Sequence, residues 1–335
     1  MFNKIYESIK KFIKENYKFF IFLTVIIFLF YYEFPYIIYK SGGTINLEDR
    51  VIIDKEYTEE GDLSMSYVTA MKGTPAFIML SFVLPDWDLM PLEEVTGEDS
   101  YEEVLEVGKE YLNEGIDNAI IAAFSESDYN INITKTINKV IYLSEESDTD
   151  IQVGDEIISV NGVSIQNLEE LKAYVNTLSE NDVVEIDVIN NDENLKRKAT
   201  IYKAEDGSLK IGIAFKTTYE YETEIPVTVK MKDNESGSSG GLMMSLAIYN
   251  ALTEEDITNG LNIVGTGTIS SDGTVGEIGG VKYKVLAANK NNADIFLCPV
   301  ENYEEAIKIK EKRNLDIEIV KVSTLKETIN YLNNK

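Results

Sequence analysis

Residues 235–252, ESGSSGGLMMSLAIYNAL, join a loop of serines and glycines to an apolar run that is typical of a buried helix. Glycine lets the backbone turn tightly, and the N–H groups that open a helix can stabilise an oxyanion. Taken alone, such a loop is more often the serine-capped start of a helix than the site of a nucleophile. A phosphate-binding loop is disfavoured, because no Lys-Ser or Lys-Thr pair follows the glycines.

A second segment, GTGTISSDGTVGEIGGVKYKVLAAN at residues 265–289, places a lysine in apolar surroundings. Lys284 precedes four apolar residues on a helix that we expect to begin near Gly280. Burial and the positive end of the helix dipole both favour the neutral amine, and a neutral lysine can act as general base for a serine hydroxyl. Without the loop of serines and glycines that begins residues 235–252, which we call the serine loop, this segment would simply indicate a solvated lysine near a helix start.

The composition excludes several kinds of site. The chain has no histidine, which removes Ser-His-Asp and Cys-His arrangements, HExxH zinc sites and a proximal-histidine haem. The single cysteine, Cys298 in the run IFLCPV, can form neither an intramolecular disulfide nor a thiolate metal site alone, and we expect it in the core. We therefore predict no metal and no cofactor. The net charge of −27, from 31 Lys and Arg against 58 Asp and Glu, makes nucleic acid an improbable partner.

The first 40 residues differ from the rest of the chain. Residues 1–18 carry five lysines and two glutamates, and the apolar run that follows extends, with few interruptions, to residue 39. We predict a cytoplasmic N-terminus at 1–18, a transmembrane helix at 19–39 and an extracytoplasmic remainder, by the positive-inside rule. A cleaved signal peptide is the alternative, less favoured because no small-x-small cleavage site follows and the apolar run is long.

The remaining sequence predicts a mixed α+β protein. Strands are expected at 63–71 and 76–84, followed by a helix at 101–114 that continues into an apolar stretch. A second unit begins near residue 129 with the short strands NINIT and KVIYL. Its further signals are an Asn161-Gly162 hairpin, a capping box of Asn167 and Glu170 that opens a helix, and an alternating strand at 182–189.

This second unit, residues 128–203, resembles a PDZ domain of the kind attached to bacterial proteases. The resemblance rests on VGDEIISVNG, then a helix, then a strand of the type VEIDVI. It implies capture of an extended peptide as an added strand. No clear GLGF-like loop precedes KVIYL, which argues against capture of a free C-terminal carboxylate, and a small packing module without a ligand is the alternative.

The serine and lysine segments together resemble the proteolytic domain of the Lon family, from about Ile225 to the C-terminus, which implies a Lon-type domain at residues 210–335. The GPSAG motif of that family falls on residues 237–241, which implies Ser239 as nucleophile, with Gly240 near the oxyanion; Ser238 replaces the proline and remains a minor rival. The family's KxK pair falls on Lys282 and Lys284, which implies Lys284 as the base. Thr266 matches a threonine that helps to orient the lysine in the family.

The order of the segments resembles the YlbL/SepM-like group of bacterial PDZ-containing membrane peptidases. The resemblance implies an ATP-independent, single-pass serine endopeptidase of the cell membrane that cleaves peptides or flexible protein segments outside the cytoplasm, and a homo-oligomer is possible. Residues 45–125 would then be the N-terminal part of the protease domain, with the PDZ domain inserted. The competing hypothesis is an inactive PDZ/Lon-like scaffold that binds extracytoplasmic partners.

Overall fold

The central sheet combines strands from the two ends of the chain. The computed structural model describes residues 2–54, 60–97, 100–144, 146–166, 168–204 and 207–335. In spatial order the six strands are β18 (Glu318–Val322), β17 (Ile295–Pro299), β14 (Asn262–Gly265), β3 (Asp62–Gly73), β1 (Phe34–Asn46) and β4 (Asp88–Pro91). In this order the first four strands pair in parallel, and the last three, from β3 to β4, pair antiparallel.

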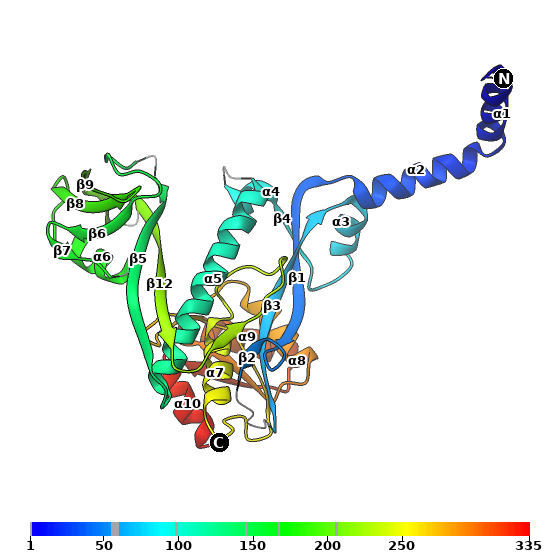
Figure 1. Cartoon of the computed structure of the whole chain (residues 1–335). Helices are drawn as coiled ribbons and strands as arrows, with labels where there is room; N and C mark the ends of the chain where they lie inside the picture. Colours follow the sequence, from blue (N-terminus) through cyan, green and yellow to red (C-terminus); the bar gives the residue numbers. More distant parts are fainter. Residues whose placement is uncertain (1, 55–59, 98–99, 145, 167, 205–206) are drawn as a thin grey trace.

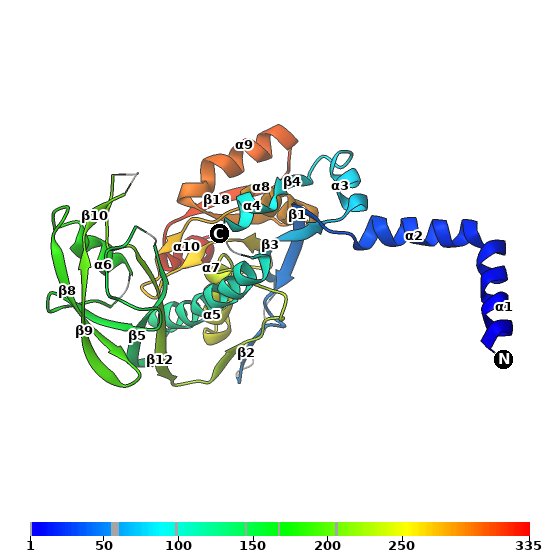
Figure 2. The same cartoon turned by 90° about the horizontal axis from the view of Figure 1, so that it is seen from above.

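Helices cover both faces of this sheet (Figures 1 and 2). One core cluster contains Ile295 and Leu297 of β17 together with residues of α5 (Tyr101–Glu126), α7 (Gly241–Leu252) and α10 (Leu325–Asn333). The other contains Phe296 and Cys298 of the same strand with residues of α8 (Val281–Lys290) and α9 (Tyr303–Arg313). Successive side chains of a strand point to opposite faces, so β17 contributes to both cores. Cys298 is buried, which confirms its predicted place in the core.

The second unit has its own sheet and its own core, with no residue shared with the other two clusters. Its strands, in spatial order, are β12 (Ile213–Thr223), β5 (Ile131–Leu143), β6 (Glu156–Val160), β8 (Val183–Asn190) and β9 (Glu193–Thr200), and β7 (Val163–Ser164) pairs with β6. The remaining elements are α6 (Leu168–Val175) and the paired strands β10 (Tyr202–Lys203) and β11 (Leu209–Lys210).

Several sequence expectations for this unit can be checked. Asn161 and Gly162 have φ values of 49° and 79° and join β6 to β7, which confirms the predicted hairpin. The strands NINIT and KVIYL form one continuous strand, β5, because β12 pairs with it from end to end. The predicted capping box depends on Asn167, which lies outside the described residues.

The β5–β12 ribbon connects the second unit to the domain built on the central sheet, and its lower end lies beside α5 in Figure 1. The Tyr221 hydroxyl donates a hydrogen bond to Asp117 of α5 at 3.1 Å, and Lys216 pairs with Glu110, about two turns earlier on the same face of that helix. Short elements complete the fold: β2 (Val51–Ile53) pairs with β13 (Val227–Val229), β15 (Thr268–Ile269) pairs with β16 (Val275–Gly276), and α4 (Leu92–Thr96) and η1 (Val300–Asn302) are single turns.

The N-terminal region differs from the predicted transmembrane helix at 19–39. Two helices, α1 (Phe2–Glu15) and α2 (Tyr17–Tyr31), project from the rest of the chain, and residues from 34 onward form β1 instead of a helix. The prediction was wrong in this part because Ile37 and Ile38 pair with both β3 and β4 and are buried in the central sheet. No helix in the described ranges combines the length and the apolar character needed to cross a membrane.

The predicted strand at 76–84 is also wrong. Residues Pro75–Ser81 form a short helix, α3, which Thr74 precedes in an extended conformation. Proline at the first position of a helix is favourable because its φ is preset and it has no N–H to leave unpaired. The predicted helix at 101–114 and the apolar stretch behind it form a single helix, α5, which a capping box of Ser100 and Glu103 opens.

Candidate active site

The serine loop lies against the middle of α5 and ends at the start of α7. The N–H of Gly237 donates to the carbonyl oxygen of Gly108 on α5 at 2.7 Å. A methyl group on Gly115, two turns further along α5, would approach the backbone and side chain of Ser238 to 3.3 Å. The absence of side chains at positions 108 and 115 therefore lets the loop rest directly on the helix.

Gly240 occupies the position where the Lon motif has alanine. It is the residue before α7, and a Cβ there would lie 2.5 Å from the sulfur of Met65 on β3. The space of an alanine methyl is thus filled by Met65, which explains why glycine fits at this position. Ser239, the residue before it, is half-buried.

Lys284 and Ser239 are connected through Thr266, which follows the end of β14. The Lys284 amine donates a hydrogen bond to the Thr266 hydroxyl at 3.0 Å, and that hydroxyl donates to the main-chain oxygen of Ser239 at 2.9 Å. The same Ser239 oxygen also accepts from the N–H of Gly267 at 2.8 Å. Among the hydrogen bonds of the described residues, none joins the Ser239 hydroxyl directly to Lys284. The structure brings the three sequence-predicted residues together, with Thr266 in the middle.

The environment of Lys284 favours its neutral form. Its side chain is 3% exposed and lies in the first turn of α8. Burial lowers the pKa of Lys284 to about 8, and Cys298 has a smaller effect in the opposite direction. Burial also raises the pKa of the Cys298 thiol to about 12, so this neighbour is a neutral thiol near pH 7.

The second lysine of the KxK pair has a different environment. Lys282 forms an ion pair with Asp88 of β4, and the Tyr283 hydroxyl donates to the same carboxylate at 2.6 Å. Desolvation of Asp88 works in the opposite direction, but these contacts hold the pKa of its carboxyl below the usual value. Lys282 therefore has a permanent counter-ion, whereas the described partner of the Lys284 amine is the neutral Thr266 hydroxyl.

Oxyanion donors are also available at the start of α7. In the described part of the chain, the N–H groups of Gly241 and Leu242 donate to main-chain oxygens, but those of Ser239 and Gly240 take part in no hydrogen bond. Two neighbouring N–H groups at a helix start provide the geometry that stabilises an oxyanion.

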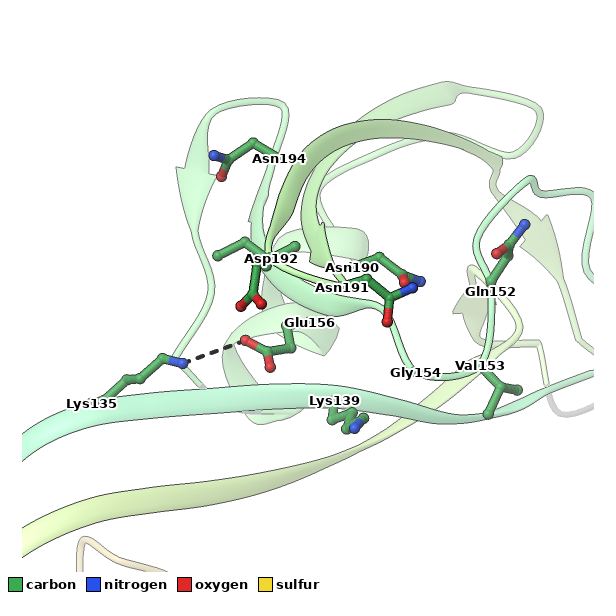
Figure 3. A pocket seen from close by; sticks show the side chains of 11 residues that line it. Lys135, Lys139, Gln152, Val153, Gly154, Glu156, Asn190, Asn191, Asp192 and Asn194 are labelled. Carbon is green, nitrogen blue, oxygen red and sulfur yellow. Dashed lines mark ion pairs between the residues drawn. The ribbon is translucent and has the colours of Figure 1, made fainter.

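A hollow of about 670 Å³ lies elsewhere, on the second unit (Figure 3). Polar residues of β5, β6 and the β8–β9 turn dominate its lining, and Lys135 pairs with Glu156 across it at 3.6 Å. None of the predicted site residues lines it. The described residues contain no group of three or more His, Cys, Asp or Glu side chains that could hold a metal ion.

Sequence reasoning did not find the contributions of Gly108, Gly115 and Met65. The two glycines stand seven residues apart on a long predicted helix, a spacing that places both on one face and could have indicated a close contact. Nothing in the sequence indicates that Met65 lies beside Gly240, because β3 and the serine loop are about 175 residues apart in the chain.

Comparisons with known proteins identify a related family. Residues 151–334 match the family model of the Lon protease (S16) C-terminal proteolytic domain. Lon protease 2 of Borreliella burgdorferi is 31% identical over 126 residues, which are 38% of this chain and 15% of that protein. The Lon protease of Haemophilus influenzae is 27% identical over 180 residues, which are 54% of this chain and 20% of that protein. The chain thus spans a fifth or less of the length of these relatives.

Among solved structures, the PDZ domain of the SdrC-like protein from Listeria monocytogenes is 20% identical, with a TM-score of 0.23, and covers 25% of this chain and 92% of that one. A solution structure from Geobacillus thermodenitrificans is 14% identical, with a TM-score of 0.21, and covers 23% and 94% of the two chains. The family model covers more than half of the chain. This chain therefore belongs to the family of the Lon protease (S16) C-terminal proteolytic domain.

Proposed function

We propose that the chain is an ATP-independent serine endopeptidase in which Ser239 is the nucleophile and Lys284 the general base. One observation carries the proposal: a buried lysine with a pKa near 8 is hydrogen-bonded to a threonine that holds the carbonyl of a serine at a helix start. A group with pKa 8 is neutral in roughly one molecule in ten at pH 7, whereas an ordinary lysine is almost never neutral there.

The proposed reaction is acyl transfer. Ser239 attacks the peptide carbonyl while Lys284 takes the hydroxyl proton, and the N–H groups of Ser239 and Gly240 stabilise the oxyanion. Lys284 then gives the proton to the leaving amine, and water hydrolyses the acyl-enzyme. Hydrogen bonds of a catalytic pair are often long in an unliganded enzyme and shorten when substrate binds, which suits the indirect contact through Thr266.

Membrane attachment through α1 and α2 is part of the proposal. Every residue of α2 is described and none is buried, so most of its Phe, Ile, Leu and Val side chains are exposed, and its contact with the domain is at the end that meets α3. The excess of lysine in residues 1–18 favours a cytoplasmic side for this end of the chain and an outer side for the acidic remainder, although α2 alone, with 15 residues, is shorter than a full crossing needs.

The second unit is proposed to capture peptides, as its resemblance to PDZ domains implies. β5 lies inside its sheet, so an added strand can pair only at an edge; among the described strands, β12 and β9 end the main order and β7 branches from β6. We place the substrate at β12, because the Tyr219 hydroxyl of this strand lies 3.1 Å from that of Ser271, beside the β15–β16 hairpin near the serine loop. Substrates would be peptides or flexible protein segments.

The proposal is tested with the full chain purified in detergent and a fluorogenic peptide library. Ser239→Ala and Lys284→Met should abolish hydrolysis, and Ser238→Ala is the matched control that should retain it. Hydrolysis that survives Ser239→Ala would overturn the assignment of Ser239 as nucleophile, whereas a folded parent protein with no activity on any peptide would favour the scaffold hypothesis. A soluble fragment must retain β1 from Phe34, because a chain that begins after residue 40 lacks half of that strand.

A further inference from the structure

An uncharged segment protrudes from the protease domain at α3. Residues 75–85, PAFIMLSFVLP, contain no charged side chain, although 27% of the whole chain is charged. Met79, Phe82 and Val83 are exposed to 65%, 80% and 76%. We call residues 79–83 the α3 patch. Adjacent exposed apolar side chains of this size are typical of a surface that contacts a membrane or another molecule.

The α3 patch is adjacent to the end of α2, on the same side of the protease domain (Figures 1 and 2). The ring of Phe30 on α2 meets that of Phe77 on α3 edge-on, with ring centres 6.4 Å apart. The ring centre of Phe77 lies 6.3 Å from that of Trp87, and the Lys40 amine lies over the Trp87 indole, 5.1 Å from its ring centre. α2 and α3 thus form one continuous apolar surface, bordered by an aromatic and a basic side chain.

We propose that the α3 patch inserts into the outer face of the lipid bilayer beside α2, as a second membrane contact of the protease domain. This inference rests on the proposed membrane attachment, because α2 sets the depth at which α3 meets the lipid. Tyr31, the last residue of α2, and Tyr32, which follows it, are suited to the interfacial region, where amphipathic rings accumulate. α3 packs beside that end and therefore lies at the same level.

A bilayer fits the patch better than a protein partner does. α2 exposes apolar side chains on all sides, and a helix of that kind needs an apolar environment all round it. The α3 patch itself carries no charge; the ion pair of Lys72 and Glu33 lies before it in the chain, and Asp86 and Asp88 follow it. Shallow insertion of apolar side chains at the boundary of headgroups and acyl chains is a common way for a protein to contact a membrane.

Two contacts make the orientation of the protease domain depend on this segment. The chain passes from the patch through Trp87 into β4, whose Asp88 pairs with Lys282 on α8, the helix that carries Lys284. Asp86 pairs with Arg313 at the end of α9. A patch fixed in lipid would therefore hold the catalytic helix in a defined position relative to the membrane surface.

The experiment uses cysteine variants of the full chain labelled with an environment-sensitive fluorophore. Cys298 is buried and does not compete for the label under native conditions, which the unsubstituted chain checks. Phe82→Cys and Val83→Cys report on the patch, Phe22→Cys on α2, and Val153→Cys on an exposed position of the second unit. Each protein is reconstituted into vesicles of phosphatidylcholine and phosphatidylglycerol, and peptide hydrolysis verifies the fold.

We expect the labels at 82 and 83 to emit at shorter wavelength in vesicles, to be quenched by lipid-borne quenchers and to be protected from aqueous iodide, while the label at 153 behaves as in water. An apolar signal at 22 with a water-like signal at 82 and 83 would overturn the inference and leave membrane attachment intact. Water-like signals at 22, 82 and 83 would overturn both. An apolar signal at 82 and 83 that disappears on dilution of the protein in lipid would identify a second copy as the occupant, and would also overturn it.

Discussion

Replacement of Lys284 by methionine should stabilise the folded protein near neutral pH while it abolishes activity. Burial lowers the pKa of Lys284 from 10.5 to about 8, and one pKa unit is worth roughly 1.4 kcal/mol, so the charged amine costs the folded state about 3 kcal/mol below pH 8. Methionine fills a similar volume without a charge. The variant loses the hydrogen bond to Thr266, worth about 1 kcal/mol. The expected net gain is therefore about 2 kcal/mol at pH 7.

The lowered pKa of Lys284 also determines how the stability of the parent protein changes with pH. Between pH 8 and 10.5 the unfolded chain binds a proton at Lys284 that the folded chain does not, so the parent protein gains stability as the pH rises through this range. We expect the advantage of Lys284→Met to be greatest at pH 7 and to vanish near pH 10. Urea unfolding at the two pH values measures it, with Ser239→Ala in both proteins to prevent self-cleavage. A Lys284→Met variant that is less stable than its parent at pH 7 would refute the conclusion that the Lys284 amine is buried and desolvated.

Three further outcomes are expected. The kcat/KM for peptide hydrolysis should rise with pH through an apparent pKa near 8, as the Lys284 amine loses its proton, and Lys284→Arg should be inactive because guanidinium stays charged; a flat profile between pH 6 and 9 would contradict this. Lys282→Arg should retain most activity, since arginine can keep the ion pair with the β4 carboxylate, and its loss of activity in the same assay would place Lys282 in the chemistry. Gly115→Val should reduce kcat by at least about tenfold because it displaces Ser238 and the serine loop, whereas undiminished turnover by a folded variant would show that the contact with α5 is unimportant.

The two segments of the candidate site could be predicted because their information is local. The glycines and serines of residues 237–241 and the apolar residues around Lys284 indicate a helix start and a buried amine, and the structure has both. The position of Thr266 between them depends on where β14 ends relative to α8, which no local pattern specifies. The supports at Gly108 and Met65 belong to segments more than 125 residues earlier in the chain, so only tertiary packing reveals them.

The errors in the N-terminal half have a common physical cause. An apolar run of the type at 34–39 fits a buried central strand and a membrane helix equally well, and periodicity alone does not separate the two. Ile37 and Ile38 belong to a strand because β3 and β4 provide partners on both sides. The run at 76–84 looked like a strand by its composition, but Pro75 starts a helix and leaves Phe82 and Val83 exposed.

Identification of the acylated residue tests the proposed Ser239–Lys284 mechanism most directly. The full chain is mixed with a peptidyl p-nitrophenyl ester, quenched in acid after the initial burst of nitrophenol, and digested for mass spectrometry. We expect the acyl group on Ser239, no adduct in Ser239→Ala, and a much slower burst in Lys284→Met. An acyl group on Ser238, or turnover in Ser239→Ala with no acyl-enzyme in either protein, would contradict the mechanism.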